Sequence, residues 1–143
     1  MFEITEEPIS ADALYSRVTR RWNGAVVTFC GVVRDHSGGR RIDYLVYEAY
    51  KEMAEKKMAE IGEEIAQKWG VTEIAVLHRV GRLSVGDISV LIAVASPHRT
   101  QAFEACRYAI DRIKECVPIW KKEIGEGGEV WIGELADSGG IEG

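Results

Sequence analysis

The chain has 143 residues, of which 46% are hydrophobic, and its 18 lysine and arginine residues are outnumbered by 23 aspartate and glutamate residues. This length and composition predict one globular domain over residues 1–143, with a flexible Gly-rich tail over residues 134–143. The net charge of -5 argues against a nucleic-acid-binding protein, which usually carries a basic face. No apolar run approaches the length of a membrane span, and the start of the chain does not resemble a signal peptide.

The three cysteines predict neither a zinc site nor a disulfide framework, because their spacings fit neither. Free thiols are typical of the reducing cytoplasm, where we expect the protein. Cys30 and Cys106 fall within apolar patterns and are interpreted as small core residues. Cys116 lies close to Lys114, which could lower its pKa, but we favour an inert thiol there as well.

The first third of the chain predicts a short helix followed by two strands. Ser10 is a suitable N-cap for a helix over Ala11 to Arg20. The β-branched run from Gly24 to Val33 predicts a buried strand, and Ile42 to Ala49 predicts a second one. Because Ser37-Gly38-Gly39 between them favours a turn, we expect the two strands to form a hairpin.

The middle of the chain predicts a long amphipathic helix from Lys51 to Trp69, ended by Gly70. Its apolar residues recur at helical spacing: Ala54, Met58, Ile61, Ile65 and Trp69. Two strands are expected next, Glu73 to Val80 and Asp87 to Ala95, joined by a connection over Gly81 to Gly86.

A second main helix is predicted from about Pro97 to Cys116, with Ser96 as its cap and Pro97 in its first position. Its expected apolar stripe is Phe103, Cys106, Ile110, Ile113 and Val117. A last short strand is expected over Val130 to Glu134. Hairpins mixed with two main helices predict an α+β fold with a mixed or antiparallel sheet.

Cations gather around this second helix. His98 and Arg99 would lie in its first turn, where the helix dipole already favours anions, so the two could bind an anion together. Alternatively, Arg99 bonds a nearby carboxylate and His98 only packs. Lys114 lies at the margin of the apolar stripe, where it either extends to solvent or lines a cleft. Lys121 and Lys122 follow the rigid Pro118 to Trp120 turn, which could support a catalytic group.

A further basic region follows the first buried strand. Arg34 is either a salt-bridge partner of Asp35 or a second anion-binding group. The segment from Ser37 to Arg41 is Gly-rich and basic, and we interpret it as mobile enough to close over a ligand.

Four segments in this order carry a resemblance to a known family. They are GVVRDHSGG (31–39), YLVYEAY (44–50), ASPHR (95–99) and IDRIKECVPIWKKE (110–123). From about Gly24 to Trp131 the chain resembles the large, catalytic subunit of molybdopterin synthase, the MoaE family. The resemblance implies an α/β-hammerhead-like fold and the conversion of cyclic pyranopterin monophosphate into molybdopterin by addition of two dithiolene sulfurs.

The resemblance also implies partners and a site. The sulfur donor is the C-terminal Gly-Gly thiocarboxylate of a small ubiquitin-like, MoaD-like subunit, in a heterotetramer built on a homodimer of the large subunit, with no metal or cofactor. The implied catalytic residues are Lys114 and Lys121. The implied substrate pocket consists of Val32, Val33, Arg34, His98, Arg99, Lys114, Lys121, Lys122 and Glu123.

Two other functions could be built on the same features. A non-enzymatic binding module could use the same basic cleft to capture an acidic peptide tail. A sulfur carrier would end in Gly-Gly, whereas here Gly139-Gly140 is followed by Ile141 to Gly143, so we expect the chain to be the acceptor.

Overall fold

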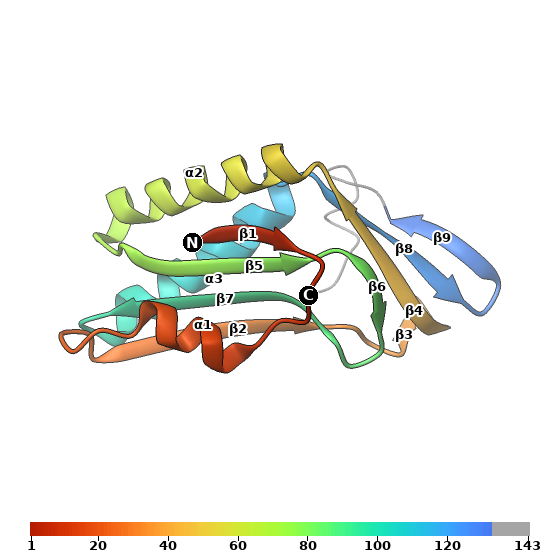
Figure 1. The fold of residues 1–143 in the computed structure, drawn as a ribbon, viewed down its shortest axis with the longest axis horizontal. Coiled ribbons are helices and arrows are strands. Elements are labelled where there is room, and N and C mark those ends of the chain that lie inside the picture. The colour runs from red at the N-terminus through yellow and green to blue at the C-terminus, as the bar shows by residue number, and fades with distance from the viewer. Residues whose placement is uncertain (133–143) are drawn as a thin grey trace.

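The computed structural model describes residues 1–132 and is built on two sheets joined along the chain (Figure 1). The first sheet has the strand order β1-β5-β7-β2, in which β1 runs parallel to β5 and the other neighbours are antiparallel. Its strands are β1 (Phe2–Thr5), β5 (Glu73–Arg79), β7 (Ile88–Ser96) and β2 (Ala25–Val32).

Helices cover both faces of the first sheet, as Figure 1 shows. The long helices α2 (Lys51–Trp69) and α3 (Arg99–Cys116) pack on one face and share the largest hydrophobic core with it. The short helix α1 (Ala11–Val18) covers the other face through Leu14 and Val18. Since β7 is covered on both sides, it reads as a nearly continuous apolar run.

The second sheet lies beyond the end of the first and is formed around β4 (Figure 1). It has the order β3-β4-β8-β9, and β6 also pairs with β4. Its strands are β3 (His36–Ser37), β4 (Arg40–Ala49), β6 (Gly81–Ser84), β8 (Ile119–Gly125) and β9 (Gly128–Ile132). A small separate core fills it, formed by Val33, Ile42, Leu45 and Leu83.

The mixed α+β fold and both main helices confirm the sequence predictions. The α2 bounds are those predicted, and Gly70 ends the helix in the left-handed conformation that glycine adopts without strain. Ser10 caps α1 by accepting a hydrogen bond from the Ala13 backbone N–H. The expected tail over residues 134–143 lies outside the described residues.

The predicted pairing of the first two strands is wrong. β2 pairs with β7 along its whole length, whereas the Gly38-Gly39 turn joins β4 to the short β3. The Gly81–Gly86 connection also contains a strand, β6, whose Leu83 is fully buried. The Pro118–Trp120 segment was expected to be a turn, but Ile119 and Trp120 are the first two residues of strand β8.

The start and the buried face of α3 also differ from the prediction. Ser96 ends β7, and its hydroxyl donates a hydrogen bond to the His98 carbonyl, so His98 rather than Ser96 is the N-cap. The helix packs through small residues, with Ala102, Ala105 and Ala109 fully buried, while Phe103 is 61% exposed. Cys106 is buried as expected, but Cys30 points outward from β2 and is exposed.

Candidate functional site

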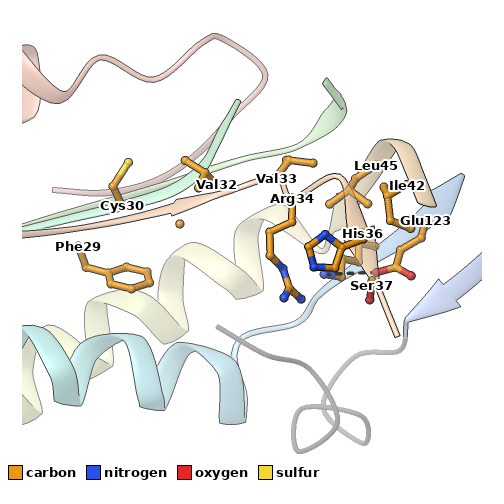
Figure 2. Close-up of a pocket in the computed structure, with 12 residues that line it drawn as sticks. Phe29, Cys30, Val32, Val33, Arg34, His36, Ser37, Ile42, Leu45 and Glu123 are labelled. Carbon is orange, nitrogen blue, oxygen red and sulfur yellow. Dashed lines mark ion pairs between the residues drawn. The ribbon is translucent and has the colours of Figure 1, made fainter. Parts of the chain in front are cut away.

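A hollow of about 250 Å³ lies where the first sheet meets the second. The end of β2 and the loop that follows it form one wall, and β4 and β8 form the other (Figure 2). It is lined by Phe29, Cys30, Gly31, Val32, Val33, Arg34, His36, Ser37, Ile42, Leu45, Lys121 and Glu123. Five of the residues implied by the family resemblance, far apart in sequence, are therefore brought together here: Val32, Val33, Arg34, Lys121 and Glu123.

Successive side chains of β8 point to opposite faces of the strand, so only one of its two adjacent lysines faces this hollow. Lys121 and Glu123 lie on one face of the strand, and their Cα partners on β4 are Tyr47 and Leu45. Lys122 lies on the opposite face, where its Nζ is 3.2 Å from Glu129 Oε1 and 5.2 Å from the centre of the Trp131 ring. The structure thus does not bring Lys122 to this hollow.

Glu123 is a buried carboxylate held between two cations. Its side chain is 5% exposed, with Oε2 3.8 Å from Lys121 Nζ and Oε1 3.3 Å from Arg40 Nη1. A dashed line in Figure 2 marks an ion pair at Glu123. Because buried charges are strongly disfavoured unless they are paired, Glu123 depends on both neighbours.

Polar groups at the end of β2 form the outer wall. Figure 2 shows the Arg34 side chain extending toward the same side as His36 and Glu123. His36 Nδ1 lies 2.7 Å from Asp35 Oδ1, and this hydrogen bond lowers the pKa of Asp35. The Ser37–Arg41 segment, interpreted above as a mobile cover, forms the β3–β4 hairpin, and Arg40 connects it to the β8–β9 turn.

The backbone at Gly31 allows this wall to form. A Cβ atom on Gly31 would lie 2.7 Å from Val90 Cγ1, so a larger residue would push β2 away from β7. The register of the two strands shifts just after it, between Gly31 and Val32. The irregularity turns the chain toward the hollow at the point where Arg34 follows.

Lys114 lines a second hollow, of about 520 Å³, between α3 and β2. The walls also include Val27, Thr28, Phe29, Phe103, Cys106, Arg107, Ile110 and Asp111. Phe29 lines both hollows, so they adjoin. Lys114 was expected either to extend to solvent or to line a cleft, and in the structure it lines a cleft.

Lys114 and Lys121 both act electrostatically on the buried side chain of His78. Its ring is packed edge-on against Tyr47, with centroids 4.9 Å apart, and the residue is 6% exposed. Burial, together with the positive charges of Lys114 and Lys121, lowers the pKa of His78 to about 4, although the Arg79 carbonyl bonded to its Nδ1 opposes the shift. Both lysines therefore lie close enough to act electrostatically on the same imidazole.

His98 and Arg99 lie elsewhere. Both are exposed, at the start of α3, whereas Lys114 lies fifteen residues further along the helix, or about 22 Å along its axis. Neither lines the two hollows described above. Within one copy of the chain, the predicted site is thus divided between the two ends of α3.

Several lining residues were not predicted from the sequence. Phe29 and Cys30 read as part of a buried strand, but β2 is an edge strand of the first sheet, so its outer side borders both hollows. Ser37 belongs to the Ser37–Arg41 segment that was expected near a ligand, and His36 could have been identified with it, because loops next to strands often carry functional residues.

The sequence model described as "MoaE protein" matches residues 4–116, most of the chain. The chain belongs to the MoaE family. It is 51% identical to the molybdopterin synthase catalytic subunits of Halalkalibacterium halodurans, over 96% of this chain and 88% of that protein, and of Bacillus subtilis, over 96% and 87%.

Solved structures in the MoaE family share this architecture. The crystal structure of molybdopterin synthase from Staphylococcus aureus superposes with a TM-score of 0.89 at 52% identity, covering 93% of this chain and 97% of that one. A MoaE protein from Burkholderia ambifaria gives a TM-score of 0.75 at 32% identity, over 90% and 85%.

Two further findings concern residues 1–132 of this MoaE chain. No helix there is both long and apolar enough to cross a membrane. The same residues contain no group of three or more His, Cys, Asp or Glu side chains that could hold a metal ion.

Proposed function

We propose that this chain is the catalytic subunit of a molybdopterin synthase and acts as a sulfurtransferase on cyclic pyranopterin monophosphate. The observation that carries the proposal is the convergence of Arg34, Lys121 and Glu123 on one hollow, with Lys114 on the wall of the adjoining one. A chain of net charge -5 that gathers cations at this point is suited to anionic ligands.

The first hollow suits the pterin and its phosphate. Arg34 donates from a planar fork that matches phosphate oxygens, and Phe29, Val32 and Val33 provide apolar surface for the pterin. Lys121 faces the same space from β8, where its main chain is paired on both sides, with β4 and with β9. This support holds the lysine in a fixed position relative to the substrate.

The second hollow suits the C-terminal tail of a small ubiquitin-like partner. It is an open groove between α3 and β2 that leads past Phe103 and Phe29 to Lys114. A Gly-Gly tail is slender enough for such a groove, and its terminal thiocarboxylate would meet the Lys114 ammonium. Lys114 would polarise the acyl carbonyl while the sulfur attacks the pterin side chain.

For each sulfur delivered, a carbon–sulfur bond forms on the pterin side chain and the acyl carbon–sulfur bond of the partner is broken by water. The partner then leaves as an ordinary carboxylate. Lys121 would act as the general acid or base when the cyclic phosphate opens and water is lost, a role worth about 10²- to 10⁴-fold in rate.

In this proposal, His98 and Arg99 contribute to the hollow of a second copy of the chain. Because they lie about 22 Å along α3 from Lys114, the same copy does not present them to the first hollow. A homodimer in which each α3 N-terminus reaches the other copy's hollow would supply them as phosphate-binding groups. The three reduced cysteines are consistent with such an enzyme working in the cytoplasm.

The test is a single incubation of the purified chain with the thiocarboxylated small subunit and cyclic pyranopterin monophosphate. Mass spectrometry should detect a product that carries two added sulfurs, together with the carboxylate form of the partner. A non-enzymatic binding module would form a complex with the partner and leave both molecules chemically unchanged, which would overturn the proposal.

A further inference from the structure

Next to the first hollow, the Arg40 side chain joins the β3–β4 hairpin to three positions of the β8–β9 hairpin. Its Nε donates a hydrogen bond to the Glu126 carbonyl at 2.9 Å, and its Nη2 donates to the Gly128 carbonyl at 2.7 Å. Its Nη1 lies 3.3 Å from Oε1 of Glu123. With its side chain only 20% exposed, Arg40 is held by three bonds in one orientation.

These contacts place Arg40 and Lys121 on opposite sides of one carboxylate. Arg40 is on the Oε1 side of Glu123 at 3.3 Å, and Lys121 is on the Oε2 side at the longer distance of 3.8 Å. Charges that are withdrawn from water interact more strongly and are screened less by salt than surface charges. The ionisation of Lys121 should therefore depend on how firmly Arg40 holds Glu123.

We propose that Arg40 is a positioning residue for Lys121: by holding the Glu123 carboxylate from the far side, it limits the negative charge that Lys121 experiences. Without Arg40, the carboxylate is free to close the 3.8 Å gap and to hold the lysine as a tight ion pair. Lys121 would then be less available to exchange protons with a substrate. The catalytic consequence rests on the function proposed above, whereas the electrostatic link does not.

Other titratable or charged groups face Lys121 from the surrounding elements. They are Tyr47 on β4, His78 on β5, Lys114 on α3, Arg34 after β2 and His36 on β3. Burial raises the pKa of Tyr47 and lowers that of His78, so both are neutral near pH 7. Glu123 is thus the carboxylate that forms ion pairs with both Arg40 and Lys121. Removing Arg40 both frees this carboxylate and takes away a positive charge, and each change raises the pKa of Lys121.

The experiment is an NMR titration of lysine side chains in the intact protein labelled with ¹³C and ¹⁵N, with the Lys121 resonance assigned by its loss in Lys121→Gln. Arg40→Gln should raise the pKa of Lys121 by about one unit. Arg40→Lys, which keeps the charge, should leave most of the wild-type value in place. The matched control is Arg41→Gln, which removes an equal charge from an exposed neighbour paired with Asp43 and should cause no shift. An unchanged or lowered pKa in Arg40→Gln would overturn the proposal.

A second comparison tests whether Arg40 acts through Glu123 and remains available if Arg40→Gln fails to fold. The double variant Arg40→Gln/Glu123→Gln leaves no buried carboxylate without its partner. Between Glu123→Gln and this double variant, the pKa of Lys121 should change by less than half of the shift expected from wild type to Arg40→Gln. A change of a full unit in the Glu123→Gln background would contradict action through the carboxylate.

Sulfur transfer provides the last readout. The limb of the pH–kcat profile that reports Lys121 should move to higher pH in Arg40→Gln by the amount seen in the titration. A Lys121 pKa that shifts while the profile stays fixed would show that Arg40 does not position Lys121 for the reaction. If the wild-type chain transfers no sulfur, the proposed function fails, and the titration alone still decides whether Arg40 controls Lys121.

Discussion

Lys121 and Glu123 point to the same face of β8, with Nζ and Oε2 3.8 Å apart, while Lys122 between them points to the other face. A strand with this alternation gives two adjacent lysines different surroundings: Lys121 faces the hollow, and Lys122 faces Glu129 and Trp131. The functional proposal depends on this difference, since Lys121 is the cation that β8 brings to Arg34.

Arg34→Gln should weaken binding of cyclic pyranopterin monophosphate by about 10- to 100-fold, because a hydrogen bond between charged groups contributes about 1.5–3 kcal/mol. Isothermal titration calorimetry measures the change directly. Arg41→Gln is the control, since Arg41 carries the same charge but pairs with exposed Asp43. Equal affinities for Arg34→Gln and wild type would remove Arg34 from the substrate site.

Mixed dimers test whether His98 and Arg99 act on the other copy. Lys121→Ala and Arg99→Ala chains, carried on different affinity tags, are co-expressed, and the mixed dimer is purified through both tags. If each site combines Lys121 of one copy with Arg99 of the other, one of two sites is intact and about half of the wild-type activity returns. Activity as low as in the parent variants would place each site within one copy.

The three cysteines should differ in reactivity, because Cys30 is exposed, with its thiol on the opposite side of β2 from Phe29 and Arg34, whereas Cys106 is buried (Figure 2). At pH 8 iodoacetamide should alkylate Cys30 first and Cys106 last, since burial raises the pKa of Cys106 to about 11. Mass spectrometry of peptides follows each thiol, and alkylation of Cys106 as fast as that of Cys30 would contradict the burial of Cys106.

Stability should decrease as the pH falls from 6.5 toward 4, in part because of His78. Its pKa is about 4 in the folded protein and 6.5 in the unfolded chain, so in this range the unfolded chain binds a proton that the folded one does not. The penalty reaches on the order of 3 kcal/mol near pH 4. Urea titrations over this range should give a shallower pH dependence for His78→Gln, and equal slopes in both proteins would show that His78 titrates normally.

Local patterns in the sequence located the three helices, although not all of their ends or the buried face of α3. The spacing of apolar residues fixed α2 at Lys51–Trp69, and Gly70 marked its end. In α3 the same reasoning selected the large Phe103, whereas alanines at 102, 105 and 109 form the buried face because they allow close approach to the sheet. Residue size was thus a poor guide to which face is buried.

Local sequence patterns did not predict which strands pair with each other. The pattern of β2 shows that it is a strand, but its partner β7 lies more than fifty residues further along the chain. The Ile119–Gly125 segment contains two lysines and a glutamate and did not read as a strand, although it carries Lys121. The sequence predicted that His98 and Arg99 lie at the start of α3 and Lys114 near its end, but it did not indicate that only the Lys114 end borders the two hollows.

The most direct test of the functional account compares Lys121→Ala and Lys114→Ala with wild type in the sulfur-transfer reaction, with the dithiolene product quantified by mass spectrometry. Lys56→Ala, on the exposed side of α2, controls for the loss of a positive charge. Each site variant should remain folded and lose at least about 100-fold in rate, while Lys56→Ala should match wild type. A near-wild-type rate for Lys121→Ala would contradict the functional account.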